Sequence, residues 1–140
     1  MRPEALAALG GSDLIIHAGD VGKPEIIEQL RGIAPTFAVR GNIDTQPWAA
    51  RLPEAEIIKV GQLSFFVLHD ISQLEVDPIV AGFAAVVFGH SHRPGIETRN
   101  GVLYLNPGSA GPRRFKLPVT VARVQVSGRD MHPEIVTLDV

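Results

Sequence analysis

The chain has 140 residues, no cysteine and a formal net charge of -2 at pH 7. This length suits one domain with one core, and 45% hydrophobic against 20% charged residues excludes an intrinsically disordered chain. The weakly negative charge argues against binding to duplex nucleic acid, and the absence of cysteine excludes disulfides, thiolate metal ligands and a cysteine nucleophile. The five histidines and the carboxylates must therefore carry any metal chemistry.

The apolar stretches and the N-terminus indicate where in the cell the protein is expected. The longest apolar stretch, Ile79 to Phe88, is about half as long as a membrane-spanning helix, and Gly82 interrupts it. The first residues, Met1 to Glu4, lead into no long apolar segment of the secretory-signal type. We therefore expect a cytoplasmic protein with no membrane partner.

The first half of the chain predicts alternating helices and strands. Pro3 to Leu9 has the pattern of an amphipathic helix. Leu14 to Ile16 then predicts a strand, Pro24 to Ile33 a helix, and Thr36 to Val39 a second strand. A strand-helix-strand unit of this kind is normally parallel and right-handed, so both strands should end at the same edge of a sheet.

The second half predicts more strand than helix. Glu56 to Val60 and Leu63 to Leu68 flank Gly61-Gln62, which is typical of a two-residue hairpin with a type II′ turn. Pro78 to Phe83 can form a short helix before a buried strand from Ala84 to Phe88. Further strands are expected at Gly95 to Thr98, Val102 to Leu105, Val119 to Val126 and Glu134 to Leu138. No repeat or linker divides the chain, so we expect a single domain over residues 1–140.

Four polar residues each follow a predicted strand, and they are Asp20, Asn42, His69 and His90. Because the carboxyl ends of parallel strands line one edge of a sheet, these side chains could converge. One carboxylate, one amide and two imidazoles suit Mn²⁺, Fe²⁺, Ni²⁺ or Zn²⁺ better than Ca²⁺ or Mg²⁺. His92, two residues beyond His90, could serve a second ion.

Each of these residues also has an ordinary structural explanation. Asp20 and Asn42 could be turn residues, and His69 could be a histidine satisfied at the end of a strand. The pair His90 and His92 is harder to explain by packing, because both lie in a glycine-led loop directly after a buried strand. The conjunction of all five favours a metal site.

Other short motifs lack the residues that their chemistry needs. Gly19 to Pro24 lacks the glycine spacing and the hydroxyl residue of a phosphate-binding loop. Pro107 to Gly111 lacks the first glycine of a nucleophile elbow, which disfavours a serine hydrolase. His17 lies within an apolar run, and we expect it outside the metal site. Arg113 begins the basic cluster Arg113-Arg114-Phe115-Lys116 and could contact a phosphate, although a solvated loop explains it as well.

The order of the motifs resembles that of the calcineurin-like metallophosphoesterases, in particular the small phosphodiesterases of bacteria and archaea. The matching motifs are Gly19-Asp20, Gly41-Asn42-Ile43-Asp44, His69, Gly89-His90-Ser91-His92 and Asn106-Pro107-Gly108-Ser109. The resemblance implies the α/β class, as a four-layer α/β/β/α sandwich of two mixed sheets. It also implies that Asp20 bridges two divalent ions, with manganese favoured and nickel, iron or zinc as alternatives. Asn42, His69 and His90 would complete the shell of one ion. His92 would bind the other.

The chain departs from the family pattern in two places. Chains of the family begin with a strand that ends in Asp-x-His, which supplies the remaining ligands of the ion bound by His92. No such motif precedes Pro3, and Pro3 to Leu9 resembles the helix that follows it. We therefore expect a domain shortened at its N-terminus that lacks its first strand, with exposed backbone that a homo-oligomer could cover. Ile43 stands where many relatives have histidine, and the small phosphodiesterases often lack that histidine as well.

These features predict a metal-dependent phosphoesterase that hydrolyses a small phosphodiester, or a phosphomonoester, with water activated at a dinuclear site. Asp44 and Asp70 are candidates for orienting the imidazole ligands. The alternative is a non-catalytic protein-interaction scaffold, since the retromer subunit of this superfamily is similar in fold. The missing Asp-x-His favours the scaffold, and the other ligands oppose it.

Overall fold

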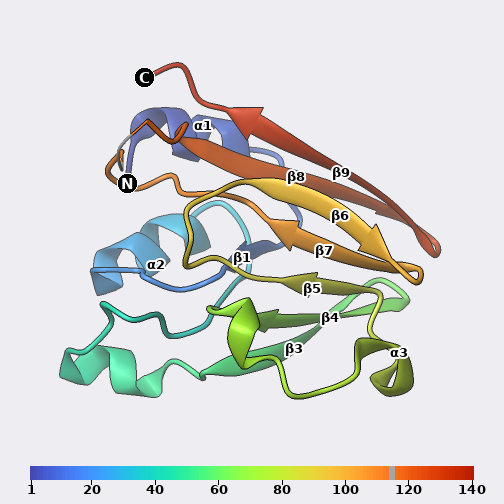
Figure 1. Cartoon of the computed structure of the whole chain (residues 1–140). Helices are drawn as coiled ribbons and strands as arrows, with labels where there is room; N and C mark the ends of the chain where they lie inside the picture. Colours follow the sequence, from blue (N-terminus) through green and yellow to red (C-terminus); the bar gives the residue numbers. More distant parts are fainter. Residues whose placement is uncertain (114–115) are drawn as a thin grey trace.

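The computed structural model describes residues 1–113 and 116–140 (Figure 1). Its helices are α1 (Pro3–Leu9), α2 (Pro24–Arg31) and α3 (Pro78–Ala81), with short 3₁₀ helices η1 (Pro47–Arg51) and η2 (Ile71–Gln73). Its strands are β1 (Ile15–His17), β2 (Thr36–Ala38), β3 (Ala55–Val60), β4 (Leu63–Leu68), β5 (Ala85–Val87), β6 (Gly95–Arg99), β7 (Val102–Asn106), β8 (Thr120–Ser127) and β9 (Asp130–Thr137). In the described part of the chain, no helix is long and apolar enough to cross a membrane.

A five-stranded mixed sheet has the order β3-β4-β5-β7-β6. β4, β5 and β7 are parallel neighbours, whereas β3 and β6 pair antiparallel at the two edges. The predicted hairpin at Gly61-Gln62 is confirmed, because Val60 pairs with Leu63 and Gly61 has a φ of 59°. The carboxyl ends of β4 and β5 therefore lie at one edge.

A second layer contains the parallel pair β1-β2 and the antiparallel hairpin β8-β9, which runs along one side of the molecule in Figure 1. Both pairs pack against α1, since Met1 and Leu9 contact the apolar cluster around Ile15 and also the cluster around Val121. The guanidinium of Arg123 adds hydrogen bonds to the carbonyl oxygen of Ala8. The helices α1 and α2 thus cover the outer face of this layer.

The main core lies between the two layers. Phe65, Val67 and Leu103 of the five-stranded sheet pack with Ile16 of β1 and Ala122 of β8. Because side chains alternate along a strand, Ile15 points the other way, into the cluster under α2. On the outer face of the five-stranded sheet, the ring of Phe83, after α3, stacks on Phe66. The chain therefore has the predicted α/β/β/α order of layers.

The hairpin β8-β9 corrects one expected boundary. β9 begins at Asp130 rather than at Glu134, and Pro133 lies inside it. The hydrogen bond from Leu138 N–H to the carbonyl oxygen of Val119 fixes which residue pairs of the hairpin are hydrogen-bonded, because these pairs alternate along an antiparallel ladder. The pair Pro133 and Val124 is not one of them, so the ladder needs no N–H from Pro133. The strand therefore begins before Pro133, earlier than the expected start at Glu134.

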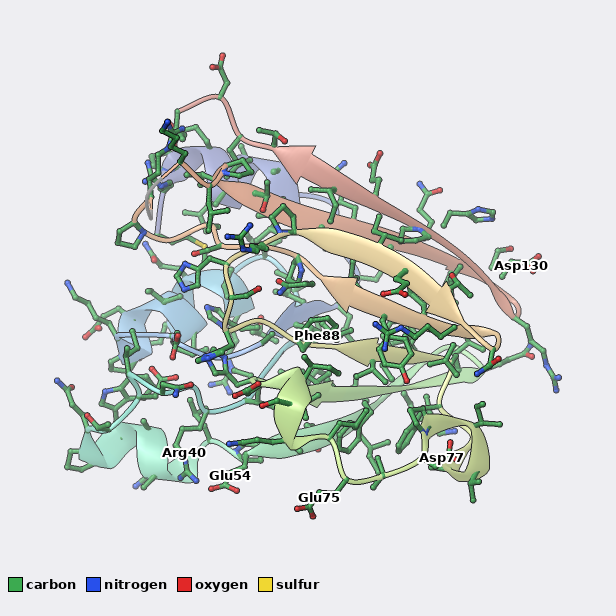
Figure 2. The ribbon with its side chains drawn as sticks, viewed as in Figure 1. Arg40, Glu54, Glu75, Asp77, Phe88 and Asp130 are labelled. Atoms are coloured by element: carbon green, nitrogen blue, oxygen red, sulfur yellow. The ribbon has the colours of Figure 1, made fainter. Side chains whose placement is uncertain are left out.

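The two layers are also joined by a surface ion pair. Arg40 follows β2 and Glu54 precedes β3, and their side chains meet with Arg40 Nη2 2.7 Å from Glu54 Oε1 (Figure 2). The backbone N–H of Arg40 donates to the carbonyl oxygen of Pro53 at 2.8 Å. These contacts hold the loop after β2, which carries Asn42, against the start of the five-stranded sheet.

Candidate metal centre

Asp20 and His69 meet at the junction of the two layers. His69 Nδ1 lies 2.7 Å from the carbonyl oxygen of Ala18, which can only accept, so Nδ1 carries the ring proton in this contact. The other ring nitrogen, Nε2, is buried, has no hydrogen-bond partner and lies 3.3 Å from Asp20 Oδ2. In the neutral ring two acceptor atoms therefore face each other, an arrangement that a bound cation would satisfy.

His90 extends the group on one side. Its ring packs edge-on against His69 with 5.2 Å between the ring centroids, and His90 Nε2 lies 3.9 Å from Asp70 Oδ2. Hydrogen bonds from the side chain and backbone of Ser72 lower the pKa of Asp70, so this carboxyl group is ionised beside His90. Asp70 thus lies beside His90, but 3.9 Å is too long for a hydrogen bond, and its role in orienting the imidazole stays a prediction.

Asn42 and His92 lie at the margin of this group. Asn42 is exposed, and the residue after it, Ile43, donates its backbone N–H to Asp20 Oδ1 at 3.0 Å. His92 lines the same cavity as Asp20, His69 and His90. Within residues 1–113 and 116–140, no three histidine, cysteine or carboxylate side chains already have the geometry of a metal site, so the ligands would have to close around an ion.

Backbone strain coincides with the candidate ligands. Asp20, His90 and His92 have φ values of 54°, 69° and 61°, in the left-handed region that residues with a Cβ rarely adopt. Apart from glycine, the described residues show such angles at one other place, Asn100, which lies in the turn between β6 and β7. Strained backbone of this kind costs roughly 1–3 kcal/mol per residue and clusters at functional sites.

Glycines allow the loops to approach one another. A Cβ atom at Gly41 would lie 2.1 Å from the backbone nitrogen of Asp20, and one at Gly19 would lie 2.4 Å from His69 Nδ1. Neither position can hold a side chain without displacement of the site. The close contact between the loops after β1, β2 and β4 therefore depends on these two glycines.

Asp44 ties two of these loops together. Its carboxylate is 4% exposed and accepts hydrogen bonds from the backbone N–H groups of Val21, Gly22 and Gly41, at 3.1, 2.9 and 2.9 Å. The sequence suggested that Asp44 orients an imidazole, but the bonds that the structure gives it all come from backbone. Its position explains how the loops after β1 and β2 keep Asp20 and Asn42 in register.

The loop that carries His90 and His92 is held by Asn106. This buried amide at the end of β7 donates through Nδ2 to the carbonyl oxygen of Gly89 at 3.1 Å and to Ser91 Oγ at 3.2 Å. Its Oδ1 accepts from the N–H of Gly108. Asn106 is thus a positioning residue, a role that its spacing in the sequence does not reveal.

His17 lies closer to the candidate site than the sequence suggested. It lines the same cavity, and its Nδ1 accepts a hydrogen bond from the N–H of Gly19 at 3.3 Å. Burial lowers the pKa of His17, while Asp44 and Asp20 act in the opposite direction. The apolar run around His17 correctly indicates a buried strand, but it carries no signal that the strand borders the site.

Arg113 lines the cavity from its open side and is exposed, with Nη2 3.4 Å from the carbonyl oxygen of Val140. The next two members of the basic cluster, Arg114 and Phe115, lie outside the described residues. The structure therefore brings Asp20, His69 and His90 together and places Arg113 on the border of the same cavity.

The comparisons place the chain in a family. Residues 1–129 match the family model of the calcineurin-like phosphoesterase superfamily domain. A probable metallophosphoesterase of Methanothermobacter thermautotrophicus is 32% identical over 141 residues, covering 96% of this chain and 81% of that protein. This chain therefore belongs to the calcineurin-like phosphoesterase superfamily.

Two solved structures share the fold at 19% identity. One is Vps29 of Entamoeba histolytica complexed with Zn²⁺, with a TM-score of 0.75 and 99% of this chain and 91% of that chain covered. The other is described as a novel archaeal phosphodiesterase, with a TM-score of 0.76 and coverages of 95% and 90%. At this identity the likeness shows a common fold.

Proposed function

We propose that the chain is a metal-dependent phosphoesterase that hydrolyses a small phosphodiester at a dinuclear centre formed by Asp20, Asn42, His69, His90 and His92. The observation that carries the proposal is the buried, unpartnered Nε2 of His69 beside Asp20. The name of the archaeal relative supports metal-dependent phosphoester chemistry, and the imidazole-rich donor set favours Mn²⁺, with Ni²⁺, Fe²⁺ or Zn²⁺ as alternatives.

The chain's own residues would orient the centre. Asp20 is held through Oδ1 by the N–H of Ile43, which leaves Oδ2 directed toward His69. Asp70 Oδ2 lies 3.9 Å from His90 Nε2, and the ring of His69 makes an edge contact with the ring of His90, so both residues border the His90 ring. When bound, divalent ions would neutralise the phosphate and lower the pKa of a water molecule. Arg113, on the border of the cavity, would contact the phosphate of a bound ester.

A hydrolysis assay tests the proposal. Purified protein is assayed with bis(p-nitrophenyl) phosphate and Mn²⁺, before and after EDTA, together with His69→Ala. We expect hydrolysis that requires Mn²⁺, and a loss of about 100-fold or more in the variant, since even residues behind the ligands contribute 10–100-fold. His132→Ala is the matched control, because His132 lies in β9 and borders a separate small pocket. Activity that survives both EDTA and Asp20→Ala would overturn the metal mechanism.

The same assay separates the enzyme from the alternative scaffold. The likeness to Vps29 favours this alternative at the level of the fold. A scaffold would bind Mn²⁺ at His69 without hydrolysing either the diester or p-nitrophenyl phosphate. That result would reject the proposed hydrolysis but would agree with the proposed metal site.

A further inference from the structure

The turn that carries Asp20 directly follows β1, and two imidazole rings hold its backbone. The N–H of Gly19 donates to His17 Nδ1 at 3.3 Å. The carbonyl oxygen of Ala18 lies 2.7 Å from His69 Nδ1. Because Asp20 has a φ of 54°, which residues with a Cβ rarely adopt, the turn depends on such partners to keep its conformation.

The contact with Gly19 fixes the tautomer of His17. A backbone N–H can only donate, so Nδ1 of the neutral ring accepts and Nε2 carries the proton. In this tautomer Gly19 uses the lone pair of Nδ1 and Nε2 has none, so the ring offers no lone pair to a metal ion. His69 has the opposite tautomer, since its Nδ1 faces a carbonyl oxygen. The two imidazoles therefore have different roles at the same turn.

Gly19 connects His17 with both candidate ligands at this turn. Gly19 directly precedes Asp20, so a shift of Gly19 moves the carboxylate of Asp20. Gly19 also packs so closely on the ring of His69 that a Cβ atom would lie 2.4 Å from His69 Nδ1. The distance of 3.3 Å between Asp20 Oδ2 and His69 Nε2 therefore depends on where the backbone of Gly19 lies.

We infer that His17 is a positioning residue, whose Nδ1 holds the backbone of Gly19 in place. This contact keeps the carboxylate of Asp20 close enough to His69 for the two to share a metal ion. The consequence for metal binding rests on the proposed function, whereas the hydrogen bond does not. Asparagine can also accept from an N–H two residues further along the chain, so it should replace His17, whereas leucine should not.

The metal-free protein gives the first readout. Two-bond proton–nitrogen correlation spectra should show His17 protonated at Nε2 and His69 protonated at Nδ1. In His17→Leu the amide of Gly19 loses its acceptor, and its hydrogen exchange should become about fivefold faster or more, the value of one net hydrogen bond. In His17→Asn the amide of Gly19 should stay protected.

Titration calorimetry with Mn²⁺ gives the second readout. Binding should weaken by about tenfold or more in His17→Leu, because residues that hold metal ligands in place typically contribute about 10–100-fold. His17→Asn should bind Mn²⁺ nearly as tightly as the unaltered protein. His132→Leu is the matched control, because His132 is an exposed histidine of β9, and its Mn²⁺ affinity should not change.

Several outcomes would overturn the inference. Protonation of His17 at Nδ1 would exclude the hydrogen bond, and equal Mn²⁺ affinities of His17→Leu and the unaltered protein would exclude the positioning role. Equal losses in His17→Leu and His17→Asn would do so too, because they would indicate that only the packing of the ring matters. If His17→Leu fails to fold, His17→Gln, whose acceptor lies one bond further out, takes its place beside His17→Asn. If the unaltered protein binds no Mn²⁺, the proposed function fails, while the tautomers and the exchange of Gly19 still decide whether His17 holds the turn.

Discussion

His69 and Asp20 follow strands of different sheets, and His69 Nε2 lies 3.3 Å from Asp20 Oδ2. The contact of His69 Nδ1 with the carbonyl oxygen of Ala18 directs the lone pair of the neutral ring toward the carboxylate. A proton or a metal ion between the two atoms removes the repulsion. This pair therefore connects the packing of the two layers with the proposed chemistry.

The first prediction concerns Asp44. Replacing Asp44 by Ala should lower the free energy of unfolding by about 2–4 kcal/mol, because the backbone N–H groups of Val21, Gly22 and Gly41 lose their acceptor in a buried site. Urea denaturation measures the change. Glu54→Ala is the control, since the exposed ion pair with Arg40 should contribute less than about 1 kcal/mol. Equal stabilities of the two variants would show that Asp44 does not hold the loops.

The second prediction concerns Gly41. Gly41→Ala should destabilise the fold by about 1–3 kcal/mol and weaken Mn²⁺ binding, because the added Cβ would collide with the backbone of Asp20. Gly95→Ala is the matched control, because a Cβ there meets nothing within 4 Å. Thermal unfolding and Mn²⁺ titration measure both effects. A Gly41 variant that binds metal like the unaltered protein would contradict the tight packing of the loops.

Much of the fold could be predicted from the sequence because its signals are local. The apolar runs before Asp20, Asn42, His69 and His90 correctly indicate strands, and parallel pairing brings their ends to one side. Gly61-Gln62 likewise predicted the hairpin turn, in which Gly61 has a positive φ. The sequence alone therefore predicts that each candidate ligand follows the end of a strand.

Other features depend on contacts between distant segments and could not be predicted. The buried position of Asp44 results from three backbone groups in two loops, and that of His17 from the packing of β1 beside the site. The start of β9 at Asp130 was missed, because the sequence does not show that Pro133 pairs with Val124 at a position where the ladder needs no N–H. Asn106 lies at the end of β7 but donates a hydrogen bond to Gly89, in the loop after β5, and this contact between distant segments has no signal in the sequence.

The third prediction concerns pH. Burial lowers the pKa of His17 below its ordinary value of 6.5, so the unfolded chain takes up a proton before the folded chain does as the pH falls. The neutral His17 side chain therefore makes its full contribution to stability above the ordinary pKa of 6.5, and this contribution is lost as the pH falls below that value. His17→Asn should lose less stability than the unaltered protein between about pH 7 and about pH 5. Urea denaturation at each pH, with His132→Asn as the control, measures the difference, and parallel curves for His17→Asn and the unaltered protein would refute it.

The fourth prediction concerns the two ions. Asp20, Asn42, His69 and His90 would all serve one ion, whereas the other would have only His92 and the shared Asp20 from this chain. Titration calorimetry with Mn²⁺ should show one tight site and a second that is weaker by about 100-fold or more. Two tight and equivalent sites would contradict this asymmetry and indicate that Asp44 or a partner subunit supplies ligands.

A crystal structure of the chain with Mn²⁺, examined by anomalous diffraction, tests directly whether Asp20 and His69 bind a metal ion. We expect the strongest anomalous peak between Asp20 and His69, with His69 Nε2 and Asp20 Oδ2 each about 2.0–2.3 Å from the ion. The His90 side chain should turn toward the same peak. An anomalous peak elsewhere, with His69 Nε2 still 3.3 Å from Asp20 Oδ2 and no ion between them, would contradict the proposed metal centre.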